Sequence, residues 1–546
     1  MGNSKFQVRA PILVAIGLAA GILLGATMIN QGKTKNLIIS SVIKFREVIS
    51  NIDKSYVDDV ETNDLVDDAI VKMLEKLDPH SIYIPKSDVA LTNADLKGEF
   101  EGIGIEFNII KDTIIVVAPI NGGPSEEAGL KSGDKIIEVD GENVAGIGIT
   151  IRGVIDRLRG PKGSEVTVGI LRLNRENLID FKIIRDKIPQ YSVDVGYMVN
   201  DEIGYIKISR FSATTYDEFK KELEDLRSQG LQKLILDMQG NPGGYMDRAV
   251  NVADEFIAGD KLIVSQDGRA KRYNAEYRAY KKGLFEDGPL IVLIDEGSAS
   301  GSEIVAGALQ DHDRALIVGR RSFGKGLVQM PIPLSDGSEL RLTISRYYTP
   351  SGRSIQKPYN GNKESYHADR MHRFENGEYF SEDSISINDS LIYKTSKGRI
   401  VYGGGGIMPD YFVPLDTTYD SPYLSQLMYN NVIREFTLNY YNENRTELDN
   451  MNLENFNNYF VVTDRMLDQM LKLANDVNIA YNEEDFEKSK PLLKNRIKAY
   501  IARSAWNNIG WYKVANEYNE IFQEALNHFE KAEHLARTES LVNKKY

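Results

Sequence analysis

The sequence predicts an α/β protein whose largest domain is built on a mainly parallel β-sheet. Between Tyr191 and about Pro414, continuous apolar runs such as "KLILDMQ", "PLIVLID" and "ALIVG" alternate with segments of helical periodicity. Apolar strands separated by helices are typical of a parallel sheet covered by helices on both faces. The chain has 546 residues, which is too long for one compact domain, so we expect further domains on either side.

Changes of pattern divide the chain into six segments. We expect a cytoplasmic tail, a transmembrane helix, N-terminal helices, a β-rich domain, the α/β core and a helical C-terminal extension; they cover residues 1–9, 10–29, 36–97, 98–187, 188–416 and 417–546. In the N-terminal helical region apolar residues recur at helical spacing until Pro79 and Pro85 stop the helix. The extension carries apolar stripes but no pattern to which chemistry can be assigned, so we expect a packing or interaction role.

Residues 10–29 carry no charged side chain and follow Lys5 and Arg9. As a helix they span roughly 30 Å, the thickness of the hydrocarbon core of a bilayer. A cleaved signal peptide is the alternative, but its apolar stretch usually has only about 7 to 15 residues. The basic flank favours a single-pass protein of the cell membrane whose remaining chain lies outside the cytoplasm, on the periplasmic side of a bacterium with two membranes.

Composition excludes several classes of function. The net charge of -13 is the wrong sign for a nucleic-acid partner. The absence of cysteine removes disulfides, thiolate metal sites and a cysteine nucleophile. The six histidines form no H-E-x-x-H motif, so we expect no catalytic metal and no cofactor.

The stretch "GRRSFGKGLVQ", residues 319–329, nearly matches a phosphate-binding loop. Such a loop needs a helix directly after its lysine. Here Pro331 and Pro333 follow, and then the alternating run "ELRLTISRYY", which predicts a β-hairpin. We therefore reject a nucleotide site and ask what else Lys325 could do.

Two strands of the predicted sheet end in glycine-rich turns, "QGNPGGYMD" and "DEGSASGSE". The carboxyl ends of parallel strands meet at one edge of the sheet, where functional groups collect. In the second turn Ser300 and Glu303 fit the capping box S-x-x-E, so Ser300 is either a plain helix cap or a nucleophile beside the helix amides. His312 lies 12 positions further on, about 18 Å along a helix, which makes it a poor base for Ser300.

Lys325 is a better candidate for the base. It follows the next strand, "ALIVG", so the sheet can bring its amine beside Ser300. Phe323, Leu327 and Val328 supply an apolar surrounding, and burial can lower a lysine pKa towards neutral. Gln329 could orient the neutral amine, although a surface glutamine is the commoner case.

With these residues the sequence strongly resembles the C-terminal processing (tail-specific) serine proteases. The matching segments are "LDPHSIYIP", "GNPGGYMDRAVNVAD", "GSASGSEIVAGALQDHDRALIVG", "SFGKGLVQ", "SDGSELRLTISRYYTPSGRSIQ" and "GGGGIMPD". The resemblance implies a crotonase-like catalytic core with Ser300 as nucleophile, Lys325 as base and Gln329 as orienting residue. It also implies that the amides of Gly243 and Gly301 stabilise the oxyanion.

The β-rich segment resembles a PDZ domain, with "EGIGIEF" as the carboxylate-binding loop. By this resemblance the amides of Ile103, Gly104 and Ile105 hold the C-terminus of a polypeptide, and the domain gates the catalytic site. The expected partners are polypeptide substrates, the membrane and a second copy of the chain, bound through the N-terminal helices or the extension. A catalytically silent PDZ scaffold is the alternative.

The chain departs from the family pattern in two places. Residues 357–397 separate "SGRSIQ" from "GGGGIMPD"; this insertion is polar and predicts an exposed loop. The helical extension is the second departure, and we infer no site from it.

Overall fold

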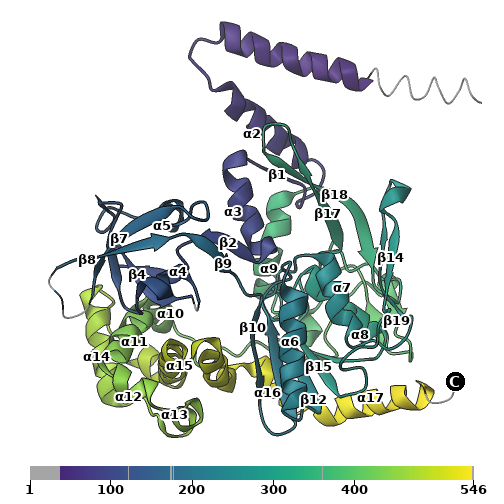
Figure 1. Cartoon of the computed structure of the whole chain (residues 1–546). Helices are drawn as coiled ribbons and strands as arrows, with labels where there is room; N and C mark the ends of the chain where they lie inside the picture. Colours follow the sequence, from purple (N-terminus) through teal and green to yellow (C-terminus); the bar gives the residue numbers. More distant parts are fainter. Residues whose placement is uncertain (1–36, 121, 173–174, 176, 360, 544–546) are drawn as a thin grey trace, which may run out of the picture. The chain divides into compact units, whose positions relative to one another are not determined.

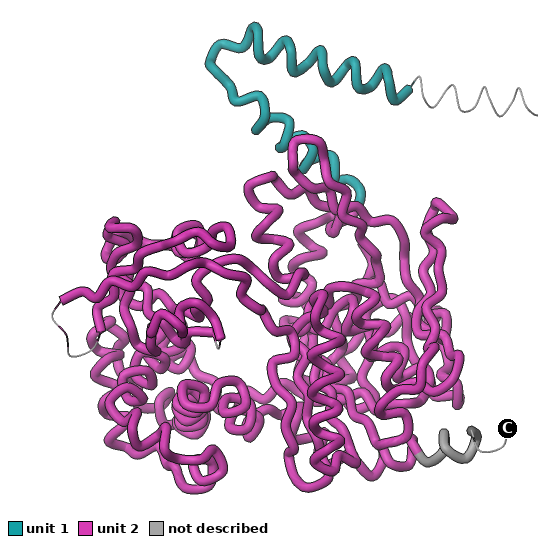
Figure 2. Tube along the Cα trace, in the orientation of Figure 1, with its two compact units in different colours: residues 1–77 teal, residues 78–546 magenta. Residues whose placement is uncertain are grey.

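The computed structural model describes residues 37–543 except 121, 173–174, 176 and 360. The chain forms two compact units, residues 1–77 and 78–546 (Figure 2). The predicted transmembrane segment, residues 10–29, lies outside the described part of the chain. No helix within the described part is long and apolar enough to cross a bilayer.

The described part of the first unit consists of two helices, as predicted. They are residues 37–55 and α2 (Thr62–Leu74). Most large apolar side chains of the first helix are exposed: Leu37, Ile38, Ile39, Val42, Ile43, Phe45 and Val48. An exposed row of this kind is typical of a surface that binds a protein or a membrane.

In the second unit, the β-rich domain, which contains β4, β7 and β8 (Figure 1), is an antiparallel sheet with strand order β3-β4-β5-β7-β8 and β6 paired to β5. Its elements are β3 (Ile105–Ile110), β4 (Thr113–Pro119), α4 (Pro124–Ala128), β5 (Lys135–Val139), β6 (Glu142–Asn143), α5 (Ile151–Leu158), β7 (Glu165–Leu171) and β8 (Ile179–Ile184). A two-stranded neck, β2 (Glu99–Gly102) with β9 (Asp186–Pro189), connects it to the rest of the unit.

The core sheet has the order β10-β11-β12-β15-β16-β21. Its strands are β10 (Val193–Met198), β11 (Ile203–Ile208), β12 (Lys233–Asp237), β15 (Leu290–Ile294), β16 (Leu316–Gly319) and β21 (Tyr411–Phe412). All neighbours from β11 onward are parallel, and only β10 is antiparallel. This confirms the predicted mainly parallel sheet.

Helices cover both faces of this sheet. Successive side chains of each strand point to opposite faces, so each face packs in a separate apolar cluster. On one face Ile206, Leu236 and Val292 pack in the cluster that includes α6 (Thr215–Ser228), α7 (Met246–Asp254) and α8 (Gly301–Asp311). On the other face Ile235 and Leu293 pack with residues of α16 (Glu520–Leu526) and α17 (Phe529–Asn543). The end of the predicted extension therefore completes the catalytic core.

A second sheet, β1-β18-β13-β14 with β17 beside β18, lies in the same unit. Its elements are β1 (Ile82–Ile84), β13 (Leu262–Asp267), β14 (Ala275–Arg278), β17 (Leu327–Pro333) and β18 (Glu339–Tyr348), with α3 (Lys86–Lys97) after β1 and η1 (Lys271–Tyr273) between β13 and β14. β17 and β18 are antiparallel, which confirms the predicted hairpin after Lys325.

The prediction of an exposed loop for residues 357–397 is wrong. This insertion forms α9 (Lys363–Glu375), η2 (Glu382–Ser384), η3 (Asp389–Leu391) and β19 (Ile392–Lys394), which pairs with β20 (Ile400–Tyr402). Tyr366 and Arg373 of α9 are only 4% exposed. Arg373 donates to the carbonyls of Arg321 and Ser322, so polar contacts fix the insertion to the loop before Lys325.

Most of the extension forms a separate helical cluster with its own apolar core. It contains α10 (Pro422–Tyr429), α11 (Val432–Glu443), α12 (Arg445–Asp449), α13 (Leu453–Tyr459), α14 (Asp464–Asp476), α15 (Glu483–Ala515) and η4 (Asn516–Tyr518). α15 is interrupted at Trp506 and Asn507, whose φ/ψ values are not helical.

Candidate active site

Two turns that follow neighbouring parallel strands meet at one edge of the core sheet. β12 leads into the turn that holds Gly243, and β15 leads into the turn that holds Ser300. A Cβ atom built on Gly243 would lie 2.7 Å from Ser300 Cβ and 2.8 Å from the Gly301 nitrogen. Only glycine fits at position 243, because a side chain would collide with the backbone around Ser300.

Ser300 has a backbone conformation that glycine normally adopts. Its φ is 52° and its ψ is −108°. Ser302 N–H donates to Ala299 O at 3.1 Å, so Ser300 is the second residue of a tight turn at the start of α8. These angles match a type II′ turn, in which glycine is preferred. Holding serine there costs about 1–3 kcal/mol, and strain of this kind clusters at functional sites.

Three backbone amides beside Ser300 differ in their hydrogen bonding. Gly243 N–H donates to Asn241 Oδ1 at 2.8 Å and is therefore occupied. Gly244 N–H and Gly301 N–H donate to no acceptor within the described part of the chain. Of the two predicted oxyanion donors, Gly301 has a free N–H and Gly243 does not. The second free N–H belongs to Gly244.

Lys325 lies in the loop between β16 and β17, half-buried, and lines the same cavity as Ser300. Its amine forms no hydrogen bond or ion pair with any residue that the structure describes, Ser300 included. Burial lowers the pKa of this amine below its ordinary value of 10.5; Glu303 and Asp78 oppose the shift and Arg341 adds to it. A lysine with a lowered pKa is suited to act as a general base.

Glu303 connects the loops of Ser300 and Lys325. Its carboxylate is fully buried, and Oε2 accepts Ser300 N–H and Lys325 N–H, each at 2.8 Å. Oε1 accepts Gly324 N–H at 2.7 Å. The Tyr347 hydroxyl lies 3.0 Å from Ser300 O and 2.6 Å from Lys325 O. Burial raises the pKa of Glu303, and the hydrogen bonds that it accepts oppose this shift.

The cavity that holds both side chains has a volume of about 690 Å³. Its apolar lining consists of Pro79, Ile82, Leu96, Pro242, Tyr245, Met246, Ile304, Leu327, Val328 and Pro331. Gln329 also lines it, and its Nε2 donates to Thr343 Oγ1 at 3.3 Å. No hydrogen bond joins Gln329 to Lys325 in the described part of the chain, so its orienting role stays a prediction.

His80 lines the cavity near Lys325, and the insertion fixes its ring. The Tyr366 hydroxyl lies 2.8 Å from His80 Nε2. Gln356 donates to this hydroxyl at 3.2 Å and accepts Gly326 N–H at 2.9 Å. The Tyr366 hydroxyl therefore contacts both the His80 ring and the amide that binds Gly326 N–H. Burial and the Lys325 charge lower the pKa of His80 to about 4, so the ring is neutral at neutral pH.

The predicted carboxylate loop lies in the β-rich domain between β2 and β3. Ile103 and Gly104 form this loop, Gly104 N–H donates to no residue of the described chain, and Ile105 begins β3, an edge strand of its sheet. Arg159 forms a β-bridge with Gly102 next to the loop. Its guanidinium lies 4.3 Å from the centre of the Phe100 ring and has no ion-pair partner among the described residues.

Sequence reasoning missed several of these groups. Glu303 was visible only as part of a capping box, and His80 only as part of "LDPHSIYIP". Arg159 could have been found from the sequence, since it stands between a predicted helix and the Gly-Pro that follows. The strand β17 after Lys325 agrees with rejection of the phosphate loop, and no cluster of three or more potential metal ligands occurs among the described residues.

Four family models match the chain. Peptidase family S41 matches residues 202–362, and the PDZ domain matches 115–172. The activating protease CtpB N-terminal domain matches 25–88. A family of unknown function, DUF8443, matches 423–507.

Known proteins match over a longer part of the chain. The carboxy-terminal-processing protease of Bartonella bacilliformis is 38% identical over 356 residues, which cover 64% of this chain and 81% of that protein. The carboxy-terminal processing protease CtpB of Bacillus subtilis is 37% identical over 58% of this chain and 66% of its own length. The structure of a photosystem II D1 C-terminal processing protease is 30% identical, with a TM-score of 0.33, over 57% of this chain and 89% of that one.

Proposed function

The chain belongs to the carboxy-terminal processing proteases of peptidase family S41, which are serine-type peptidases with a PDZ domain, and we propose that it cleaves polypeptides with Ser300 as nucleophile and Lys325 as base. The observation that carries the proposal is the shared acceptor Glu303 Oε2, which binds the backbone of both residues while both side chains line one cavity.

Lys325 acts as a neutral amine in the first step. It takes the proton from the Ser300 hydroxyl as Oγ bonds to the carbonyl carbon of the scissile peptide. The resulting ammonium then gives this proton to the leaving amine nitrogen when the C–N bond breaks. Water attacks the acyl-enzyme ester with Lys325 again as base, which releases the new carboxylate and restores Ser300. The lowered pKa of Lys325 supports this role.

The tetrahedral oxyanion needs donors that are free before the reaction. Gly301 N–H meets this condition, so we keep it as the first donor. Gly243 N–H is already donated to Asn241, so we assign the second donor to Gly244. Gln329 would orient the Lys325 amine, since both residues line the same cavity.

The PDZ domain would capture the C-terminal end of a substrate. Its ligand would add as a strand to the open edge of β3, with its carboxylate at the amides of Ile103, Gly104 and Ile105. Arg159, beside this loop and without an acidic partner among the described residues, would supply the positive charge. No cofactor takes part in this mechanism.

We further propose that residues 10–29 anchor the protein in the cell membrane with its catalytic part outside the cytoplasm. The uncharged stretch of about 30 Å with a basic flank supports this proposal. The exposed apolar row of the helix over residues 37–55 supports a homo-oligomer formed through the N-terminal helices.

Cleavage of an unstructured polypeptide by purified protein tests the proposal. Ser300→Ala and Lys325→Ala should each reduce cleavage by at least about 10³-fold while the melting temperature stays within a few degrees. A serine-reactive phosphonate should label the parent protein but not Ser300→Ala. Full activity of either variant, or no cleavage by a parent protein that fails to label, would contradict the proposal and favour a silent PDZ scaffold.

A further inference from the structure

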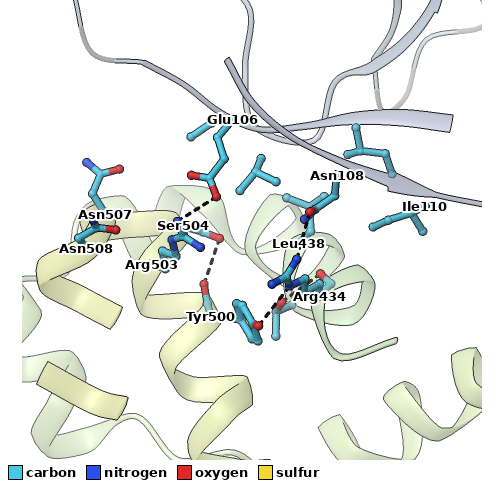
Figure 3. Close-up of a pocket in the computed structure, with 14 residues that line it drawn as sticks. Glu106, Asn108, Ile110, Arg434, Leu438, Tyr500, Arg503, Ser504, Asn507 and Asn508 are labelled. Atoms are coloured by element: carbon cyan, nitrogen blue, oxygen red, sulfur yellow. Dashed lines mark hydrogen bonds and ion pairs between the residues drawn. The ribbon is translucent and has the colours of Figure 1, made fainter. Parts of the chain in front are cut away.

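The C-terminal helices pack against the PDZ domain on the outer face of β3 and β4. Lys111 pairs with Glu435 of α11 at 2.8 Å, and Glu106 pairs with Arg503 of α15 at 2.9 Å. Figure 3 shows both arginines of this interface, Arg434 and Arg503, beside the strand. Arg434 donates to Asn108 Oδ1 at 3.1 Å.

Apolar and backbone contacts complete the interface. Ile110 and Ile115 of the PDZ domain form a buried cluster with Leu438 of α11. A Cβ atom built on Gly133 would lie 2.1 Å from Asn442 Nδ2, so the helix meets the PDZ backbone directly. The remaining cavity between the two parts is only about 70 Å³, too small for a peptide ligand.

The charges at this interface define one register. The PDZ strand offers an acidic residue, Glu106, near one end and a basic residue, Lys111, just past the other. The helices offer Arg503 and Glu435 in the matching order. A reversal of the strand would bring like charges together, and a shift would separate both ion pairs, so the charges favour this one register. Because the PDZ domain is tethered through its neck, its contact with the helices is intramolecular and is favoured by a high effective concentration.

The same helices are fixed to the catalytic core. α15 is interrupted at Asn507, whose φ of 54° is unusual for a residue other than glycine. After the interruption, Asn508 Nδ2 donates to Asp194 O at 3.1 Å and the Tyr512 hydroxyl donates to Asp194 Oδ2 at 2.6 Å, at strand β10. The first half of α15 thus contacts the PDZ domain, and the second half contacts the core.

The contact leaves both functional surfaces of the enzyme uncovered. Glu106, Asn108 and Ile110 face the helices, whereas Ile105, Phe107 and Ile109 belong to the PDZ core. The carboxylate loop lies before Glu106, outside the contact. None of the described residues between 98 and 187 lines the catalytic cavity.

We propose that α11 and α15, in the segment that matches a family of unknown function, are a dock that holds the PDZ domain away from the catalytic cavity in a substrate-ready position. This inference rests on the proposed function. By this inference the extension keeps the catalytic cavity open. A captured C-terminus then reaches an accessible Ser300 without a large movement of the PDZ domain.

Cross-linking tests the dock, because the chain has no cysteine of its own. In Lys111→Cys/Glu435→Cys, a short bis-maleimide should join the PDZ domain to α11. The kcat/KM for an unstructured protein substrate should then stay within about 2-fold of that of the same variant without cross-linking. Each single cysteine variant treated alike is the control. If cross-linking lowers kcat/KM more than about 10-fold while phosphonate still labels Ser300, the PDZ domain must move and the inference is overturned.

Release of the dock is the complementary test. Leu438→Asp should lower kcat/KM about 10-fold or more for a protein that presents its C-terminus and raise proteolytic sensitivity at the neck. Met428→Asp, on the exposed surface of α10, is the matched control and should change neither. Higher activity after release would mean that the contact is inhibitory, contrary to the inference. Activity in Ser300→Ala would instead refute the proposed function.

Discussion

Ser300 and Lys325 donate their backbone N–H groups to the same atom, Oε2 of Glu303, each at 2.8 Å. The two residues are 25 positions apart and lie on loops after different strands. A single buried carboxylate therefore ties the two loops together and fixes the separation between the backbones of the residues that we propose as nucleophile and base.

Glu303→Gln tests this connection. The amide keeps one oxygen but turns an NH₂ group towards donors, so at least one buried donor loses its acceptor, which costs about 1–3 kcal/mol. We expect kcat to fall about 10- to 100-fold and KM to change little. Because the Glu303 charge raises the pKa of Lys325, the pH–activity curve should also move to lower pH. A loss of stability with no movement of this curve would contradict the positioning role.

The pH dependence of kcat/KM should follow the Lys325 amine. Activity should be low while the amine is protonated and rise to a plateau as the pH passes a pKa below the ordinary value of 10.5. Since the pKa of His80 is about 4, no second inflection should appear between about pH 5 and 8 from this ring. Initial rates across pH with a neutral peptide check both points.

Arg341→Gln should move that curve to higher pH. The Arg341 charge lowers the pKa of Lys325, so its removal favours the ammonium form and reduces activity near neutral pH. Arg346→Gln is the matched control, because Arg346 lies on the same strand, β18, but is exposed. A shift of equal size in both variants would mean a general charge effect rather than a local one.

Ser300→Gly and Ser300→Ala should differ in stability although both lack the nucleophile. Glycine relieves the positive φ of 52°, worth about 1–3 kcal/mol, and loses part of this gain to its greater freedom in the unfolded chain. We expect Ser300→Gly to have the higher free energy of unfolding by about 1 kcal/mol. Denaturant unfolding of the two inactive variants measures the difference, and equal values would mean that the turn is not strained.

Local pattern was enough to predict the elements that carry the candidate site. The alternation of apolar strands and helices predicted the parallel sheet, and the proline-flanked run after Lys325 predicted the hairpin β17–β18. These features depend on neighbours in sequence, which a single chain displays directly. The position of Ser300 at the start of α8 was visible for the same reason.

Contacts between distant segments could not be predicted in this way. The S-x-x-E pattern indicated a local bond from Ser300 to Glu303, but the bond from Lys325 N–H exists only in the folded chain. The insertion has a polar composition, and its buried residues meet distant segments: Tyr366 contacts His80 and Phe323, and Arg373 contacts the loop before Lys325. The packing of α16 and α17 on the second face of the core sheet likewise joins segments that are distant in sequence.

Tyr366→Phe tests whether the insertion supports the candidate base. The ring stays packed against Phe323, with ring centres 6.1 Å apart, while the hydrogen bond to His80 is lost. His80 and Gln356 then both lose their contact with this hydroxyl, and Gln356 is the acceptor of Gly326 N–H. We expect kcat/KM to fall about 10-fold, with a melting temperature within a few degrees of the parent.

The matched control for this substitution is Tyr280→Phe, because the Tyr280 side chain is 77% exposed. It should leave kcat/KM unchanged. Gln356→Ala should reproduce most of the loss, since it removes the acceptor of Gly326 N–H directly after Lys325. If Tyr366→Phe has parent activity while Gln356→Ala does not, the support of the lysine loop runs through Gln356 alone, and the hydroxyl of Tyr366 contributes only packing.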